Sequence, residues 1–447
     1  MRTKPSILLK TKYGLLKGNE REFCNEFLGI RYARAGRFEY AEPVDHADTE
    51  EYDATAFGGV CPQTRTYYEH LEIPERMFYH KEFRDGITYD YDEDCLNLNV
   101  YAPKKADHAP VIVFIHGGGF NSGSVKDSNF DGEAYAKRGI VLVTLNYRVG
   151  VLGYFAHEKV LGRYGHDGNF GLHDQLTAIQ WVKRHIADFG GDPDNITLMG
   201  QSAGAISIQY LCLMPDNKDL FRRAIMMSGG GMFPKFALPR PVAQTREYWK
   251  NFMEIAGCET FEEIRDLDLK ALFTAIEEIK KVRKDNTYNT MPVIDGYLLP
   301  APVDTLITKP LKIDYMIGYT NNDMYAPIMA HIGNVFANAN NGYVYYFDID
   351  APGPDKNGAF HSADLRYVFH TLSSSHRPYT AWDEEVSELM VDYISAFASC
   401  GDPNGDGRPL WKRASGKALC FRKKSVKFGR PGWCKLVWNM ITKGDPK

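Results

Sequence analysis

The sequence predicts an α/β fold in which helices cover both faces of a mostly parallel, doubly wound sheet. The first observation is a series of short apolar runs, rich in β-branched residues, such as 111–115 and 140–145. Runs that are apolar throughout suit parallel strands that are buried on both faces. The second observation is that segments with apolar residues at helical spacing, such as 172–188, lie between these runs. Such an alternation of strands and helices implies a mostly parallel sheet.

The strands and helices can be assigned in chain order. Strands are expected at 111–115, 140–145, 196–199, 224–227, 313–317 and 343–347. Helices are expected at 132–138, 172–188, 205–210, 241–283 and 384–398. Gly190-Gly191 stops the helical pattern of 172–188, as glycine commonly does at helix ends. Sheets of this kind bind ligands outside the carboxyl ends of their strands, so the residues that follow each strand are the candidate site residues.

The most specific motif is Gly200-Gln201-Ser202-Ala203-Gly204, which stands between an expected strand and an expected helix. A sharp turn between a strand and a helix presents a serine at its apex, and side chains at the flanking glycines would collide with neighbouring backbone. A small-residue turn is the alternative interpretation of the pentapeptide alone. The strand and helix on either side favour Ser202 as a nucleophile, which then needs a group to take its proton.

A glycine run, Gly117-Gly118-Gly119, follows the strand expected at 111–115. Its bare backbone N–H groups can turn toward a developing oxyanion. A flexible loop and a phosphate-binding loop are the alternatives. The phosphate-binding pattern is weak, because no Lys-Ser/Thr pair follows and the G-x-G-x-x-G register fails at Ser122.

The candidate base is His361, in a loop that follows the expected strand 343–347 and precedes a helical pattern. His370, at a helix end, and His376, in a polar segment, are the alternatives. A loop at the carboxyl end of a strand is where a base could meet the serine turn, so position favours His361.

The candidate acid is Asp323, just past the expected strand 313–317. Asp314 lies too early, inside that strand, and Asp295 reads as a turn residue. An acid is needed to orient the base and to stabilise its protonated form. The resulting chain order of serine, aspartate and histidine is the order expected of α/β-hydrolases.

Composition narrows the class of protein further. The formal net charge of the 447-residue chain is −4, which argues against a dedicated nucleic-acid binder or a binder of anionic membranes. The cysteines and histidines show no zinc-type spacing, and no apolar run is long enough to span a bilayer. The first residues lack the apolar stretch of a signal peptide, so we expect a cytoplasmic protein with reduced cysteines. We expect one domain over 1–447 with a helical insertion at about 231–290.

Several segments together resemble the type-B carboxylesterases, the family that also includes the cholinesterases. The matching segments are 93–100, 116–120, 146–150, 168–175, 189–193, 200–204, 358–369 and 401–404. The resemblance implies an α/β-hydrolase fold without a cofactor or a metal. It also implies Ser202 as nucleophile, His361 as base and Asp323 as acid. The oxyanion donors that it implies are Gly118, Gly119 and Ala203.

The chain departs from the family pattern at three places. Relatives usually carry glutamate before the nucleophile, where this chain has Gln201, and glutamate as the acid, where it has Asp323. The segment between Asp323 and His361 is also shorter than in relatives, in which a longer helical region helps to wall the acyl pocket. We therefore expect a trimmed, more open pocket.

Cys61 and Cys95 match positions that are disulfide-bonded in many secreted relatives. Two free thiols in a packed surface loop are the alternative. The loop between them is rich in aromatic residues and could form one wall of the gorge; these residues are Tyr67, Tyr68, Phe78, Tyr79, Phe83, Tyr89 and Tyr91.

Taken together, the residues and the resemblance predict a cofactor-independent serine carboxylesterase that acts on small-molecule esters. A feruloyl or other plant-phenolic esterase is the main alternative within the family. A peptidase on the same fold is a further alternative, since the same triad cleaves amides. A non-catalytic, cholinesterase-like binding protein is disfavoured, because it would be expected to have lost the nucleophile or the base. The sequence predicts neither the natural substrate nor the oligomeric state.

Overall fold

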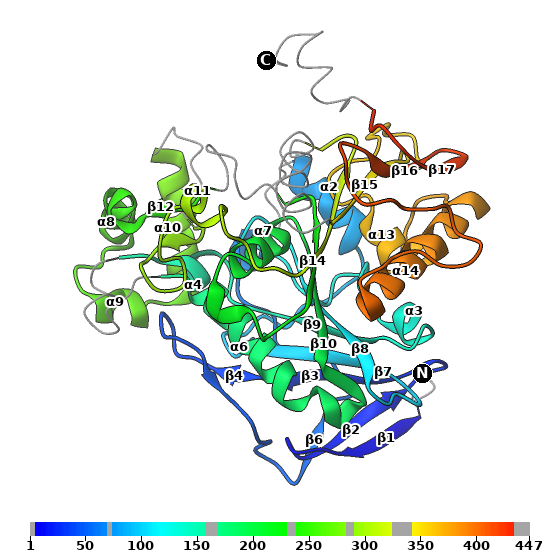
Figure 1. Ribbon diagram of the computed structural model, residues 1–447. Coiled ribbons are helices and arrows are strands. Elements are labelled where there is room, and N and C mark those ends of the chain that lie inside the picture. The colour runs from blue at the N-terminus through cyan, green and yellow to red at the C-terminus, as the bar shows by residue number, and fades with distance from the viewer. Residues whose placement is uncertain are drawn as a thin grey trace.

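The computed structural model describes residues 5–68, 74–157, 168–229, 238–282, 290–323 and 342–432. The described part is organised around a sheet of 13 strands in the order β1-β2-β3-β7-β9-β8-β10-β11-β14-β15-β16-β17, with β6 paired to β2 (Figure 1). All neighbours from β9 to β16 along this order are parallel. The predicted α/β-hydrolase fold, with a mostly parallel central sheet, is confirmed.

The strands of the main sheet have the following bounds: β1 Ser6–Lys10, β2 Leu15–Glu20, β3 Cys24–Arg31, β6 Glu51–Asp53, β7 Asn97–Pro103, β8 Ala109–Ile115, β9 Val141–Leu145, β10 Gly191–Gln201, β11 Arg223–Met227, β14 Asp314–Thr320, β15 Tyr343–Asp348, β16 Ala418–Arg422 and β17 Ser425–Gly429. Two small pairs lie outside it: β4 Ala33–Arg34 with β5 Glu42–Pro43, and β12 Arg240–Pro241 with β13 Val293–Ile294.

The described helices are α1 Thr64–Tyr68, α2 Pro74–Phe83, α3 Glu133–Ala136, α4 Gly150–Tyr154, α6 Phe170–His185, α7 Ala203–Leu211, α8 Arg246–Ala256, α9 Phe261–Asp266, α10 Leu269–Val282, α11 Val303–Leu306, α13 Leu365–Val368 and α14 Ala381–Cys400. None of the helices in these ranges is long and apolar enough to cross a membrane.

Alternate residues of the central strands pack into two separate cores. In β8, Val111 and Val113 belong to a core that includes residues of α6 and α7. Their neighbours Ile112 and Phe114 belong to a second core, formed with residues of α3 and α14. Because successive side chains of a strand point to opposite faces, both faces must be covered by helices, which explains why these strands are apolar throughout.

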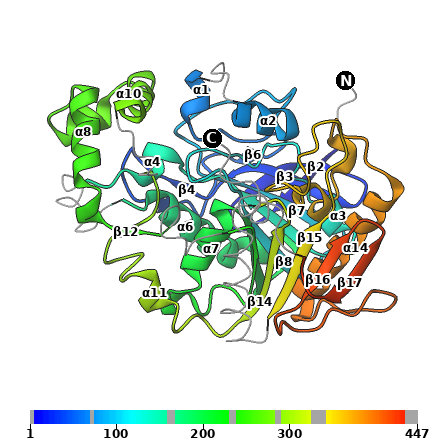
Figure 2. The same cartoon turned by 90° about the horizontal axis from the view of Figure 1, so that it is seen from above.

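The predicted helix at 241–283 is divided into α8, α9 and α10. Gly257, with φ of 72°, ends α8 in the left-handed conformation. Thr260 then begins α9 with a capping box to Glu263. These helices lie on the far side of the molecule from α14, β16 and β17 (Figures 1 and 2). The single-domain organisation with an insertion at 231–290 stays a prediction.

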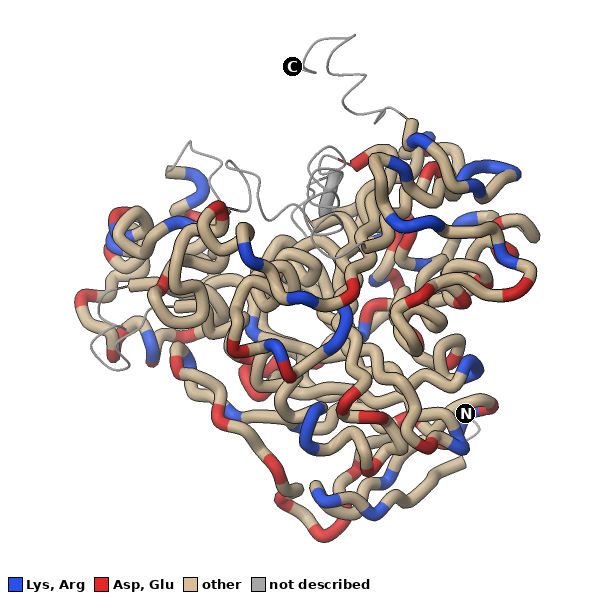
Figure 3. The backbone as a smooth tube through the Cα atoms, viewed as in Figure 1, with Lys and Arg blue, Asp and Glu red and all other residues tan. Residues whose placement is uncertain are grey.

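The sheet also has antiparallel strands at both edges, which the sequence patterns do not predict. β1, β2, β3 and β7 pair in antiparallel fashion on one side, and β17 pairs with β16 on the other. β1 alternates between exposed and half-buried residues, which is a weaker signal than the continuous apolar runs of the centre. Basic and acidic residues are interspersed over the described chain (Figure 3), in agreement with the small net charge of −4.

Candidate active site

Ser202 stands at the junction of β10 and α7, as the motif predicts. Its φ of 54° is unusual for a residue other than glycine, and such conformations cluster at functional sites. Its N–H donates to the carbonyl of Met227 on the neighbouring strand β11 (2.8 Å). A Cβ at Gly204 would lie 2.0 Å from the carbonyl oxygen of Ile115, so only glycine allows α7 to start this close to β8. The turn is therefore held from both neighbouring strands.

The structure brings the three predicted residues of the triad together. Ser202 Oγ lies 2.9 Å from His361 Nε2, and Asp323 Oδ2 lies 2.9 Å from His361 Nδ1. Ser202 follows β10, Asp323 follows β14 and His361 follows β15, so each residue lies beyond the carboxyl end of one of three parallel strands. The Asp323 side chain is fully buried, whereas that of His361 is 22% exposed. This is a continuous chain of hydrogen bonds from a buried carboxylate to a serine hydroxyl.

Two carboxylates raise the pKa of the His361 imidazole. Burial alone would lower the pKa of this imidazole, but the charge and hydrogen bond of Asp323, together with the charge of Asp364, raise it above the usual value. No pattern in the sequence marks Asp364. It is completely buried, accepts a hydrogen bond from the Tyr345 hydroxyl (2.7 Å), and burial raises its pKa to about 6. Asp364 is therefore largely ionised at neutral pH and can stabilise a protonated His361.

The glycine run follows β8 and packs beside the serine turn. Gly118 has φ of 123°, and a Cβ there would lie 1.9 Å from the carbonyl oxygen of Ser122. The N–H groups of Asn121 and Ser122 both donate to the Gly118 carbonyl (3.1 Å each), which holds the loop in a tight turn. Ala203 is the first residue of α7, so its N–H has no acceptor within the helix. The predicted oxyanion donors thus lie on two backbone segments that meet at Ser202.

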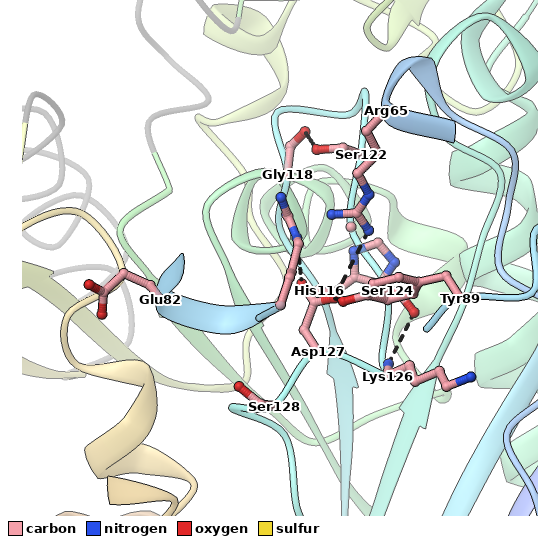
Figure 4. Close-up of polar contacts among 12 residues, drawn as sticks. Arg65, Glu82, Tyr89, His116, Gly118, Ser122, Ser124, Lys126, Asp127 and Ser128 are labelled. Atoms are coloured by element: carbon pink, nitrogen blue, oxygen red, sulfur yellow. Dashed lines mark hydrogen bonds and ion pairs between the residues drawn. The ribbon is translucent and has the colours of Figure 1, made fainter. Parts of the chain in front are cut away.

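A buried polar cluster supports the glycine run from the side (Figure 4). His116 lies 2.8 Å from the carbonyl of Gly117 through its Nδ1, which must carry the proton because a carbonyl only accepts. Burial lowers the pKa of His116 to about 4, so its ring is neutral at pH 7. Asp127 accepts a hydrogen bond from Tyr89 (2.6 Å) and pairs with Arg84 at 3.3 Å. This cluster ties the segment around residue 89 to the loop that carries the glycines.

The alternative bases and acids have other partners. His370 contacts Ser387 through Nδ1 (2.8 Å), and His376 lies 3.7 Å from Glu82. Asp314 is the first residue of β14 and pairs with Arg223 at 3.6 Å. Asp295 accepts from the backbone N–H groups of residues 297 and 299, as in the predicted turn. Among the candidates, the geometry favours His361 and Asp323.

Cys61 and Cys95 are both buried free thiols in the structure. Part of the aromatic segment between them contacts the base loop: the Tyr79 hydroxyl donates to the carbonyl of His361 (3.1 Å), and Phe78 packs on Phe360 at 4.9 Å between ring centres. The side chains of Tyr67 and Tyr68 lie outside the described part of the chain.

Residues 324–341 also lie outside the described part of the chain, and the expected open pocket therefore stays a prediction. Among the described residues, no group of three or more histidines, cysteines and carboxylates could hold a metal ion.

The chain is similar to known esterases over most of its length. A family model described as the carboxylesterase family matches residues 5–337 and 323–425. The para-nitrobenzyl esterase of Bacillus subtilis (strain 168) is 28% identical over 465 residues, which cover 89% of this chain and 90% of that protein. The bile salt-activated lipase of Mus musculus is 32% identical over 416 residues, which cover 71% of this chain and 68% of the lipase.

Solved structures show the same similarity in three dimensions. A PNB esterase superimposes with a TM-score of 0.79 at 26% identity, covering 94% of this chain and 96% of its own. An esterase from the anaerobic Clostridium hathewayi, described as able to hydrolyse aliphatic aromatic polyesters, superimposes with a TM-score of 0.80 at 24% identity. Its alignment covers 95% of this chain and 97% of that esterase, and it shows a common fold.

Proposed function

The chain belongs to the carboxylesterase family and is an ester-hydrolysing enzyme, and we propose that it acts through an acyl-enzyme intermediate formed on Ser202. The observation that carries the proposal is the chain of two 2.9 Å contacts from Asp323 through His361 to Ser202. A serine hydroxyl becomes nucleophilic when an adjacent base accepts its proton, and the base works best when a third group orients it. The substrates are carboxylic esters of small molecules.

The reaction proceeds in two halves. Ser202 Oγ attacks the ester carbonyl while His361 Nε2 accepts its proton, and the N–H groups of Gly118, Gly119 and Ala203 stabilise the oxyanion. The imidazolium then protonates the departing alcohol as the tetrahedral intermediate collapses to the acyl-enzyme. In the second half, His361 takes a proton from water, which attacks the acyl group and releases the acid and free Ser202.

Asp323 is well suited to the role of the acid although it is one methylene shorter than the glutamate usual in the family. Its 2.9 Å contact with His361 Nδ1 supports this assignment. The contact fixes the tautomer in which Nδ1 carries the proton, so Nε2 is the nitrogen that can accept the proton of Ser202. The buried carboxylate also stabilises the imidazolium that forms during the reaction.

A substrate panel tests the proposal and separates its alternatives. We expect hydrolysis of p-nitrophenyl esters and none of the matching p-nitroanilides. A series of acyl-chain lengths, together with feruloyl esters and acetylated sugars, would define the acyl and alcohol preferences. Faster cleavage of anilides than of esters would favour the peptidase alternative and contradict the proposal.

The acid limb of the pH profile should lie above the ordinary pKa of histidine. His361 must be neutral to act as a base, and its raised pKa means that activity is lost as the pH falls through this higher value. The Asp364→Asn variant removes one of the two charges that raise the pKa, so its limb should move to lower pH with little change in the plateau. The measurement is kcat/KM against pH for both proteins. A limb that stays in place in the variant would show that Asp364 does not act on His361.

Replacement of Gly118 by alanine should damage the oxyanion site. The new Cβ would collide with the carbonyl of Ser122, and φ of 123° disfavours any side chain. The loop must shift, so we expect kcat to fall by about 10²–10³-fold, as when one oxyanion donor is lost. The matched control is Gly139→Ala, at φ of 76° with no atom within 4 Å of the new Cβ. Equal activity of the two variants would contradict the role of Gly118.

A further inference from the structure

The side chain of Gln201 crosses from the serine turn to the base loop. Its amide Nε2 donates to Ser362 Oγ (2.8 Å) and lies 3.3 Å from His361 Nε2. Gln201 is 3% exposed and Ser362 is 6% exposed, so this hydrogen bond is shielded from water. Gln201 precedes Ser202 and Ser362 follows His361, which means that the bond runs beside the 2.9 Å contact between nucleophile and base.

Ser362 adopts a backbone conformation that needs such a partner. Its φ of 79° lies in the left-handed region, which residues other than glycine rarely occupy. A strained conformation of this kind persists only where its surroundings hold it in place. The carbonyl of Ser362 accepts from the N–H of Leu365 (3.1 Å), and Tyr79 holds the carbonyl of the preceding His361 (3.1 Å). Gln201 supplies the contact on the side that faces the nucleophile.

We propose that Gln201 and Ser362 form a positioning pair that sets the distance between Ser202 and His361. This inference rests on the proposed function of Ser202 as nucleophile and His361 as base. Neither side chain of the pair exchanges a proton with the substrate. Their hydrogen bond restrains the base loop against the serine turn, and proton transfer depends steeply on that alignment.

The amide suits this position because it is neutral. Within the described part of the chain, the groups that contact the His361 side chain or act on its charge include the carboxylates of Asp323 and Asp364, the Ser202 hydroxyl and the Gln201 amide. The Tyr79 hydroxyl instead binds the backbone carbonyl of His361. A carboxylate at position 201 would add a third negative charge close to the imidazole and would favour its protonated form. The glutamine thus ties the two loops together without making His361 harder to deprotonate.

Two variants remove the hydrogen bond between Gln201 and Ser362 without adding charge. Gln201→Met keeps the length of the side chain and loses the amide, whereas Ser362→Gly loses the hydroxyl and relieves the backbone strain. For each we expect kcat for p-nitrophenyl acetate to fall about tenfold, KM to change less than about twofold, and the acid limb of the pH profile to stay in place. The double variant should be no slower than the slower single variant, because both changes break the same contact.

The Gln201→Glu variant separates the effect of the hydrogen bond to Ser362 from the effect of charge at position 201. Its carboxylate can accept a hydrogen bond from the Ser362 hydroxyl, so the plateau of kcat at high pH should stay close to that of the wild type. Its acid limb should move to higher pH, because the added charge favours protonated His361. The matched control for backbone strain is Lys356→Gly, an exposed position with φ of 53° outside the site. This control should melt at the same or a higher temperature with unchanged kcat.

The deciding experiment compares these variants with the wild type and with Ser202→Ala, after thermal melting has shown that each is folded. The positioning pair is overturned if Gln201→Met and Ser362→Gly match the wild type in kcat while Ser202→Ala is inactive. It is also overturned if the effects of the two single variants add in the double variant. Activity that persists in Ser202→Ala would instead overturn the proposed function, so the two failures can be told apart.

Discussion

Replacing Ser202 by alanine is expected to reduce kcat for ester hydrolysis by about 10⁶-fold. In other serine hydrolases the loss of the nucleophile costs about this much, because no other group can form the covalent intermediate. Ser202 Oγ lies 2.9 Å from His361 Nε2. The substitution removes only this hydroxyl and leaves Cβ in place. The fold should persist, since the backbone bond from Ser202 to Met227 does not involve the side chain. The measurement is kcat for p-nitrophenyl acetate, with the melting temperature as a check.

The matched control for this variant is Ser207→Ala, in the same helix α7. Ser207 is fully buried, and its hydroxyl has no hydrogen-bond partner within the described part of the chain. Removing that hydroxyl should leave kcat unchanged. If Ser202→Ala retained a substantial fraction of the wild-type rate, another residue would have to be the nucleophile.

Asp323→Asn should lower kcat by about 10⁴-fold, as the same change does in serine-protease triads. The asparagine keeps the shape of the side chain but removes the charge that stabilises protonated His361. It can also present an N–H to Nδ1, which would favour the tautomer whose Nε2 carries the proton and cannot act as the base. KM should change little, because the carboxylate is fully buried behind the histidine. The measurement is the steady-state rate over a wide range of pH.

Asp364→Asn is the matched comparison for this second variant. Both carboxylates are fully buried and both act on His361, but Asp364 makes its hydrogen bond to Tyr345. We therefore expect Asp364→Asn to shift the pH profile with nearly full plateau activity, in contrast to Asp323→Asn. Comparable loss of kcat in both would mean that the histidine is oriented by the two carboxylates jointly.

The main features of the site could be predicted from sequence because each depends on short-range constraints. The serine turn needs glycines on both sides of a strand-to-helix junction, and the glycine run needs positive φ at Gly118. His361 and Asp323 follow strands whose apolar runs are easy to recognise. Once the sheet is assumed to be parallel, the ends of these strands must lie at the same edge.

The remaining features depend on contacts between distant parts of the chain. The bond from Gln201 to Ser362 joins residues 161 positions apart, and no local pattern marks it. Asp364 is a carboxylate at a helix start, a common place for an acid at the surface, and only the fold shows that it is buried beside the triad. The break between α8 and α9 is different, because local residues mark it: Gly257 ends α8, and the capping pattern Thr260-x-x-Glu263 begins α9.

Identification of the acylated residue tests the central claim most directly. The enzyme is mixed with p-nitrophenyl acetate or with a fluorophosphonate, quenched in acid, and measured by intact-mass and peptide mass spectrometry. The proposed mechanism predicts one acetyl or phosphonyl group per chain, carried by Ser202, and none in Ser202→Ala. A protein that hydrolyses the ester but carries no such group, or carries it at another residue, would contradict the assignment of Ser202 as the nucleophile.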